Sequence, residues 1–350
     1  MNIAHLDTLP KAVLHEHLDG SLRIGTVLEL AEEAGYGGLP TSDRSDLAAW
    51  FYQGDSGSLE NYLEAFDQTI AVLTTRDALA RVAEELVEDL AADGAVYAEV
   101  RFGPSLHVSP TLEREDAIEA VLDGLARGSA KTGCAAYLIV GALRQYDDSE
   151  AVARAASRFV GEGVVGFDLA GPEAGYPCDD HLPAINHARE AGLGITIHAG
   201  EGDGPNSIWR ALGRCGAARI GHGVRIIEDA VLVDGDIEKL GKLARMVRDH
   251  RVPLEMCITS NLHTGVADSA EDHPFGALWR AGFAVTINTD NQLMSQISLG
   301  HEYALAAETF GLSIQDVGRI VERTIEAGFG DWSDRKKLLT DVIRPAYGIE

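Results

Sequence analysis

The stretch LHEHLDG, residues 14–20, places two histidines one residue apart within an apolar run. In an extended chain, alternate side chains point to the same face, so His15 and His17 are neighbours while Glu16 points the other way. Two imidazoles held side by side on a strand are suited to binding one metal ion. We therefore expect His15 and His17 to be metal ligands, and Glu16 to face outward in a structural role.

Other ionisable residues follow short apolar runs further along the chain. His198 and Glu201 occur in GITIHAGE, His222 in ARIGHGV and Asp290 in AVTINTD. Each taken alone could be a hydrogen-bonded core residue or a turn cap, but structural residues have no reason to choose the same end of several strands. Three histidines and one carboxylate form a suitable set for Zn²⁺, with a position left for water. Such an ion lowers the pKa of its water and supplies hydroxide.

The number of metal ions can also be judged from the sequence. Barrels with two metals often use a bridging lysine carbamate on the fourth strand, and no lysine occurs in 164–171. We therefore expect one Zn²⁺ per chain. Glu201 follows His198 by three residues and suits a proton carrier beside the metal. His222 could orient the nucleophile, accept its proton or act as a fourth nitrogen ligand.

Eight apolar runs must position these residues, and segments with helical periodicity separate most of them. Strands that alternate with helices indicate βα units, and eight of them predict an α/β fold, a closed (β/α)8 TIM barrel. We interpret residues 1–350 as a single domain. The runs are AVLHEHLD (12–19), AVYAEVRF (95–102), CAAYLIVGAL (134–143), VVGFDLAG (164–171), GITIHAGE (194–201), ARIGHGV (218–224), PLEMCITS (253–260) and AVTINTD (284–290).

The first connection is much longer than the others and looks helical. This insertion, about 20–94, would lie at the C-terminal end of the barrel and could cap a pocket there, or it could be a helical layer that serves stability alone. Further helices are expected at 112–126, 150–160, 237–250, 301–310, 313–328 and 332–346.

Charge and composition restrict the possible partners and compartments. The net charge of −26 argues against nucleic acid and anionic lipid as partners. The four cysteines are widely spaced, and we expect them to be reduced and mostly buried thiols. The N-terminus MNIAHLDTLPK carries no leader pattern and no apolar run reaches membrane-spanning length, so we expect a cytoplasmic protein. Oligomeric state is left open.

The spacing of the motifs separates this chain from other catalytic classes. HEH carries its histidines at i and i+2 on a strand, unlike the helical H-E-x-x-H. The P-C-x-x-C of cytidine-type deaminases is absent, as is the phosphate-binding G-x-x-x-x-G-K-[ST].

Taken together, the motifs resemble those of the adenosine deaminase family, a mononuclear branch of the metal-dependent amidohydrolases, and most closely its actinobacterial members. The matching stretches are PKAVLHEHLDGSLR, YAEVRFGPSLH, VVGFDLAGPE, TIHAGE, RIGHGVRI and TINTDN, in family order from residue 10 to residue 291.

The resemblance implies a role for each matching residue. His15, His17, His198 and Asp290 would bind zinc. Glu201 would donate a proton to purine N1, while His222 and Asp290 would orient and activate the attacking water. Substrate contacts are implied for His17, Asp19, Gly171 and Asn291, with Asp19 on a ribose hydroxyl and the Gly171 backbone at N3.

Two positions depart from the family pattern. Asn291 stands where many members have a second aspartate, so an amide would contact purine N7. Ile258 replaces the proline that usually follows the cysteine after the seventh strand, which relaxes the backbone there.

The implied activity is hydrolytic deamination of adenosine and 2′-deoxyadenosine to inosine and 2′-deoxyinosine, with release of ammonia. One alternative is the same chemistry on another 6-aminopurine compound, such as adenine, an N6-substituted purine or aminodeoxyfutalosine. Another is a catalytically silent barrel that binds a nucleoside.

Overall fold

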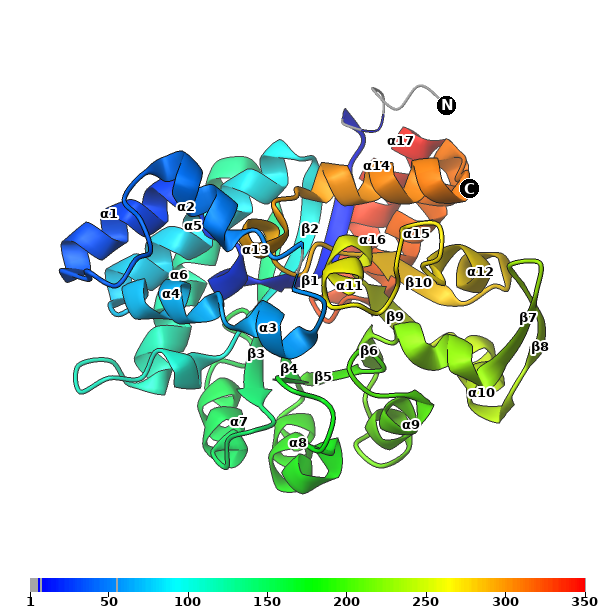
Figure 1. Cartoon of the computed structure of the whole chain (residues 1–350), viewed down its shortest axis with the longest axis horizontal. Helices are drawn as coiled ribbons and strands as arrows, with labels where there is room; N and C mark the ends of the chain where they lie inside the picture. The colour runs from blue at the N-terminus through cyan, green and yellow to red at the C-terminus, as the bar shows by residue number, and fades with distance from the viewer. Residues whose placement is uncertain (1–5, 7, 55, 350) are drawn as a thin grey trace.

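A computed structural model describes residues 6, 8–54 and 56–349, and eight parallel strands form its centre (Figure 1). Residues 1–5 and 7 of the N-terminal segment, for which no leader pattern is predicted, lie outside the described residues. The eight strands expected from sequence are all present; β2 matches its apolar run, and the other seven are slightly shorter than theirs. They are β1 (Lys11–His17), β2 (Ala95–Phe102), β3 (Ala135–Leu143), β4 (Val164–Ala170), β5 (Gly194–Ala199), β6 (Arg219–His222), β9 (Pro253–Met256) and β10 (Ala284–Ile287).

The strands pair in sequence order, from β1 to β10, and an isolated bridge brings the first and last strands together. The closure is made beyond the end of β10, where Glu16 and Asp290 form a parallel bridge. The order and the parallel pairing confirm the predicted TIM barrel. The carboxyl ends of all eight strands therefore point to one rim.

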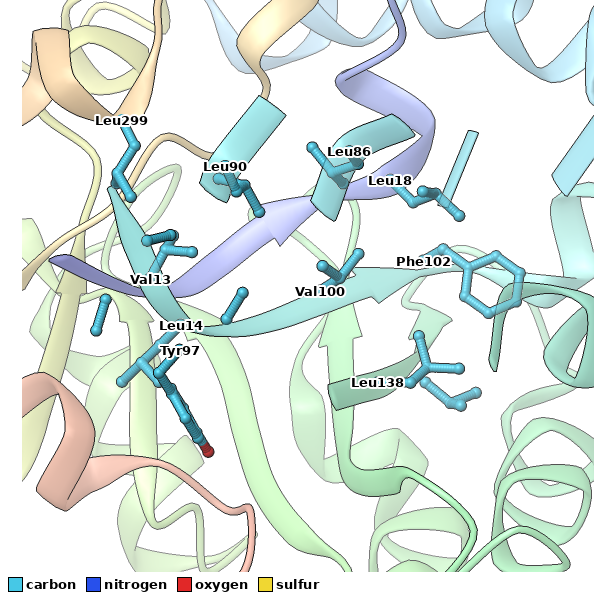
Figure 2. Close-up of a cluster of buried hydrophobic side chains, with 14 of the residues drawn as sticks. Val13, Leu14, Leu18, Leu86, Leu90, Tyr97, Val100, Phe102, Leu138 and Leu299 are labelled. Carbon is cyan, nitrogen blue, oxygen red and sulfur yellow. The ribbon is translucent and has the colours of Figure 1, made fainter. Parts of the chain in front are cut away.

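Helices cover the outside of the strands. Figure 2 shows Leu86 and Leu90 near Val13 of β1 and Val100 of β2, all of them fully or almost fully buried. The covering helices include α5 (Arg76–Ala92), α6 (Arg114–Thr132), α7 (Ser149–Ser157), α8 (Leu182–Glu190), α9 (Pro205–Gly213), α10 (Lys242–Asp249), α12 (Phe275–Arg280), α14 (Leu299–Phe310) and α15 (Ile314–Ala327).

The local sequence explains where these helices begin and end. In α6, Glu113 and Asp116 form a reciprocal capping box, which satisfies two of the free N–H groups of the first turn. Gly133 then ends the helix with φ 82°, a left-handed conformation that glycine adopts without a steric penalty.

The connection from β1 to β2 is helical, as expected. It contains η2 (Leu18–Gly20), α1 (Ile24–Ala34), α2 (Arg44–Phe51), α3 (Leu59–Leu63) and α4 (Phe66–Val72) before α5. Helix α5 packs along α6 and against β2, so it belongs to the outer wall of the barrel. Helices α1 to α4 precede that wall helix, and we refer to them as the cap.

The prediction of a helix over residues 237–250 is wrong for the first part of that segment. An antiparallel hairpin of β7 (Ala230–Val233) and β8 (Asp236–Leu240) occupies its first residues, and α10 begins only at Lys242. The turn between the strands is Asp234–Gly235, and both residues have positive φ. An Asp-Gly pair between two strands is a strong hairpin signal, and it overrides the helical spacing of the apolar residues that follow.

The other predicted helices are present, with shifted ends. The C-terminal segment contains α16 (Trp332–Lys337), the π-helical stretch η6 (Leu338–Ile343) and α17 (Arg344–Tyr347). The remaining short elements are η3 (Pro104–Leu106), η4 (Cys178–His181), η5 (Val224–Asp229), α11 (Ile258–His263) and α13 (Gln292–Ser295). All four cysteines are free and buried, as expected. In the part of the chain that the structure describes, no helix has both the length and the apolar character needed to cross a membrane.

Candidate active site

Four side chains from the two ends of the chain and from its middle converge at the carboxyl rim of the barrel. The Nε2 atoms of His17 and His198 lie 3.3 Å apart. Asp290 Oδ1 lies 3.3 Å from His15 Nε2 and 3.4 Å from His17 Nε2. The structure thus brings together the four residues for which metal binding was predicted.

The outward-facing nitrogens of two of these histidines are already occupied. His15 Nδ1 lies 3.0 Å from a Glu255 carboxylate oxygen, and His198 Nδ1 lies 3.1 Å from a carboxylate oxygen of Asp168. A carboxylate only accepts hydrogen bonds, so each Nδ1 carries the proton and each Nε2 presents a lone pair. The lone pairs point into the cluster.

This arrangement is suited to a cation. Two nitrogen lone pairs and the Asp290 carboxylate face one another, and buried acceptors cannot satisfy one another without a shared positive charge. His15 Nε2 has no hydrogen-bond partner among the described residues, as expected for a free ligand atom. The donor set of imidazole nitrogen and carboxylate oxygen matches a borderline divalent ion such as Zn²⁺.

The carboxylates behind the histidines belong to a buried charge network. Arg101 pairs with Asp168 at 3.0 Å and with Glu255 at 2.8 Å, and all three side chains are almost fully buried. Burial alone would raise the pKa of Asp168, but the contact with His198, including its hydrogen bond, and the charge of Arg101 outweigh it and hold that pKa below its ordinary value. Asp168 therefore stays ionised and keeps His198 in its Nδ1–H form.

Asp290 reaches the cluster in an unusual backbone conformation. Its φ is 63°, in the left-handed region that non-glycine residues rarely adopt, and His222 has φ 59°. Asp290 is held there by Ser260, whose hydroxyl donates to Oδ2 at 2.6 Å and leaves Oδ1 facing the histidines. Two such strained residues at one rim are typical of a functional site.

Glu201 lies next to the cluster, in the loop after β5. Burial, reinforced by the charges of Asp290 and Glu173, raises the pKa of Glu201 well above its ordinary value. Its Oε1 accepts from the Thr264 hydroxyl at 3.1 Å, and its Oε2 lies 3.4 Å from His222 Nε2. Glu201 therefore holds a proton more readily than an ordinary carboxyl group does.

Glu173 holds the Glu201 loop in place. Its carboxylate accepts from the backbone N–H groups of Gly200 at 2.6 Å, Glu201 at 3.0 Å and Gly202 at 2.8 Å. Three converging N–H groups are strong partners for a buried carboxylate. Glu173 was not singled out from the sequence, although it follows Gly171 closely in the stretch VVGFDLAGPE.

A cavity of about 290 Å³ opens above the cluster and is lined by all the predicted site residues except His15. The cap closes one side of it with Leu59, Tyr62, Leu63 and Phe66. A larger groove of about 860 Å³ lies outside and shares only Leu59 and Glu201 with this cavity. The convergent polar groups lie in the smaller cavity, whose volume approaches the lower end of the range for small-molecule sites.

Three predicted substrate contacts line this cavity. Asp19 and Asn291 are almost fully buried, and the Oδ1 atom of each has no hydrogen-bond partner among the described residues. Gly171 has φ 92°, and a Cβ there would lie 2.4 Å from Gln145 Oε1, so the backbone at this point requires glycine. Gly20 similarly leaves the room that the Asn291 side chain fills.

Glu16 differs from its predicted environment. It points away from the metal cluster, but it is fully buried and bonds to the hydroxyls of Ser21 and Thr289. It therefore links η2 to the segment before Asp290, because packing of the β1–β10 seam covers the outer face of the strand.

Sequence reasoning missed the residues that support the cluster. Asp168, Glu255 and Asn261 contact His198, His15 and His222 respectively. A signal was present for two of them, since Asp168 and Glu255 are acidic residues inside apolar strands, and such residues require a buried partner.

The model of the adenosine deaminase family matches residues 10–345 of this chain. An adenosine deaminase from the actinobacterium Mycobacteroides abscessus is 47% identical over 355 residues, covering 100% of this chain and 98% of that protein. The similarity to actinobacterial sequences is thereby confirmed.

Solved structures show the same architecture. An adenine deaminase from Arthrobacter aurescens superposes with a TM-score of 0.85 at 26% identity, over 95% of this chain and 98% of that one. The N6-mAMP deaminase of Arabidopsis superposes with a TM-score of 0.81 at 29% identity, over 95% of this chain and 97% of that one.

Proposed function

The chain belongs to the adenosine deaminase family, and on that premise we propose that it hydrolyses adenosine and 2′-deoxyadenosine to inosine and 2′-deoxyinosine with release of ammonia. The observation that carries the proposal is the position of Glu201. This carboxyl, whose pKa is raised by burial, faces the same cavity as a cluster of lone pairs that can bind a cation. Such a pair of groups suits addition of water to a ring carbon next to a basic nitrogen.

We propose that one Zn²⁺ per chain is held by His15, His17, His198 and Asp290. A bound Zn²⁺ lowers the pKa of water towards neutrality and so supplies a nucleophile at working pH. The ligand histidines are kept in the required tautomer by Asp168 and Glu255.

Glu201 donates its proton to N1 of the purine. Protonation of N1 draws electrons from C6, and this makes C6 a better acceptor for the attacking oxygen. The Glu201 proton resides on Oε2, because Oε1 already accepts from Thr264 and lies near the Asn261 amide. Asp290 and His222 orient the attacking water on the other side of the ring.

The remaining substrate contacts follow from the lining of the cavity. The unpartnered oxygen of Asp19 accepts a hydrogen bond from a ribose hydroxyl, and His17 contacts the same end of the nucleoside. The Asn291 amide donates to N7, which it can do without any prior proton transfer. The backbone of Gly171 meets N3.

The charge of the cavity favours a nucleoside over a nucleotide. Of the described residues that line it, Arg101 is the sole arginine or lysine, and both of its carboxylate partners are in place. The lining also includes the carboxyl groups of Asp19 and Asp67. A 5′-phosphate would meet carboxylates with no free cation to pair it.

A substrate panel tests this proposal. The zinc-loaded protein should convert adenosine and 2′-deoxyadenosine, followed as the loss of the ultraviolet absorbance of the 6-amino chromophore. AMP, adenine, N6-methyladenosine and aminodeoxyfutalosine should react much more slowly. Preference for any of the last four would redirect the proposal to another 6-aminopurine, and no turnover of any compound would favour a silent nucleoside-binding barrel. We expect the enzyme to act in the cytoplasm and to bind neither nucleic acid nor membranes.

A further inference from the structure

Asn261 lies between the two residues proposed to handle protons. It stands in α11, is fully buried, and its Nδ2 lies 3.2 Å from His222 Nδ1 and 3.4 Å from Glu201 Oε1. Its Oδ1 lies 3.2 Å from His273 Nε2. A primary amide has donors at one end and an acceptor at the other, so the direction in which Asn261 points decides what its neighbours can do.

His273 determines that direction. The backbone N–H of Phe275 donates to His273 Nδ1 at 3.2 Å, so this nitrogen is an acceptor without a proton. Burial lowers the pKa of His273 to about 3, and the neutral ring therefore carries its proton on Nε2. The partner of Nε2 must accept, and this places the oxygen of Asn261 towards His273 and its NH₂ group towards His222.

We propose that His273 and Asn261 are positioning residues that lock His222 as a hydrogen-bond donor at Nε2. Since Asn261 donates to Nδ1, the Nδ1 lone pair is used, and the single ring proton lies on Nε2. His222 then has no free lone pair to bind a metal ion or to take a proton from water. Of the three roles open to His222, only orientation of the nucleophile remains.

The Asn261 amide also determines which oxygen of Glu201 carries the proton. The Asn261 NH₂ and the Thr264 hydroxyl both donate towards Oε1, so the acid proton is left on Oε2. Oε2 faces His222 Nε2 at 3.4 Å, and both atoms then carry protons that are free to point at substrate and nucleophile.

The catalytic part of this inference rests on the proposed function, whereas the proton positions do not. They can be read directly from the ¹⁵N signals of the histidine side chains in uniformly labelled protein, with and without zinc. Comparison with His222→Gln assigns the His222 signals. We expect an unprotonated Nδ1 and a protonated Nε2 in both forms. A protonated Nδ1 at His222 would overturn the inference, even if the enzyme proves fully active on adenosine.

Variants test whether His273 acts on His222 through Asn261. Asn261→Asp has the same shape but only accepts, so it should move the His222 proton to Nδ1 and lower kcat by roughly 10²-fold, with KM within about threefold of wild type. His273→Gln presents an N–H at the place of Nε2 and should retain the wild-type tautomer and most of the activity. His273→Phe removes the donor and should behave like Asn261→Asp.

Folding of each variant is checked by circular dichroism and thermal melting. If Asn261→Asp folds and His222 keeps its proton on Nε2, Asn261 does not control the tautomer and the inference fails. If the protein shows the expected ¹⁵N pattern but deaminates no purine nucleoside, the proposed function fails, while the inference about the His222 tautomer is retained.

Discussion

The backbone N–H of Asp290 donates to the carbonyl of His15 at 3.0 Å, so two predicted metal ligands 275 positions apart are also the seam that closes the barrel. The Asp290 carbonyl in turn accepts from the N–H of His17 at 2.7 Å. Closure of the fold and assembly of the site are therefore one event, and a disturbed seam will disturb metal binding.

Replacement of Glu201 by glutamine should separate chemistry from metal binding. Glutamine keeps the shape but cannot transfer a proton, so we expect about one zinc per chain and a fall in kcat of roughly 10²-fold or more. Metal analysis and steady-state kinetics check both quantities. Glu228→Gln is the matched control, because Glu228 is an exposed lining residue of the outer groove and should be silent. Unchanged kcat in Glu201→Gln would refute the assigned role.

Asn291→Ala should weaken purine binding. The amide is the proposed donor to N7, so its loss should raise KM about tenfold, which corresponds to one hydrogen bond in a buried site. Zinc content, measured by mass spectrometry, should not change. Loss of zinc instead would make Asn291 a support of the metal site, since it directly follows Asp290.

Glu173→Gln should lower kcat through the position of Glu201. The amide replaces one accepting oxygen with a donor that opposes the backbone N–H groups, at a cost of about 1–3 kcal/mol in the free energy of unfolding. Chemical denaturation and kinetics measure the two effects, and Asp180→Asn, an exposed carboxylate on the same segment, serves as the control. A variant as stable and as active as wild type would show that the loop holds without this carboxylate.

Removal of metal should lower stability as well as activity. The Nε2 atoms of His17 and His198 then lie 3.3 Å apart, and Nε2 of His15 has no hydrogen-bond partner among the described residues, with no cation to bind them. We expect Tm to fall by about 5 °C on treatment with a chelator, relative to protein in excess zinc, and to recover when zinc is returned. Calorimetry checks this. A Tm that does not depend on zinc would contradict the proposed site.

Stability should decrease as pH rises through the slightly acidic range, in part because of Glu302. Burial raises the pKa of Glu302 from 4.5 to about 7. Between these values the folded protein holds a proton that the unfolded chain has lost, so the stabilisation is complete below pH 4.5 and fades up to pH 7. One such proton contributes a slope of up to about 1.4 kcal/mol per pH unit.

Glu302→Gln should remove that contribution. Its free energy of unfolding, measured in urea at several pH values, should therefore fall less steeply with rising pH than that of wild type. Glu308→Gln, on the exposed side of the same helix, should leave the slope unchanged. Equal slopes in wild type and Glu302→Gln would show that Glu302 ionises normally.

The sequence alone determined the strand count, the parallel barrel and the rim at which the polar residues gather. These features depend on local periodicity and on the rule that parallel strands direct their carboxyl ends to one side. The alternation within LHEHLDG was enough to place His15 and His17 on one face. The helix predicted over 237–250 was wrong in its first part, because a two-residue turn, rather than the spacing of the apolar residues, determined the secondary structure there.

The tertiary structure alone decided how the site residues are held. Asp168 and Glu255 orient the histidines across the interior, Glu173 reaches over from another loop, and His273 sets the amide of Asn261. These contacts join residues on different strands and loops, and they depend on hydrogen-bond direction. No pattern along the chain encodes that direction, because each proton is placed by a partner that folding brings beside it.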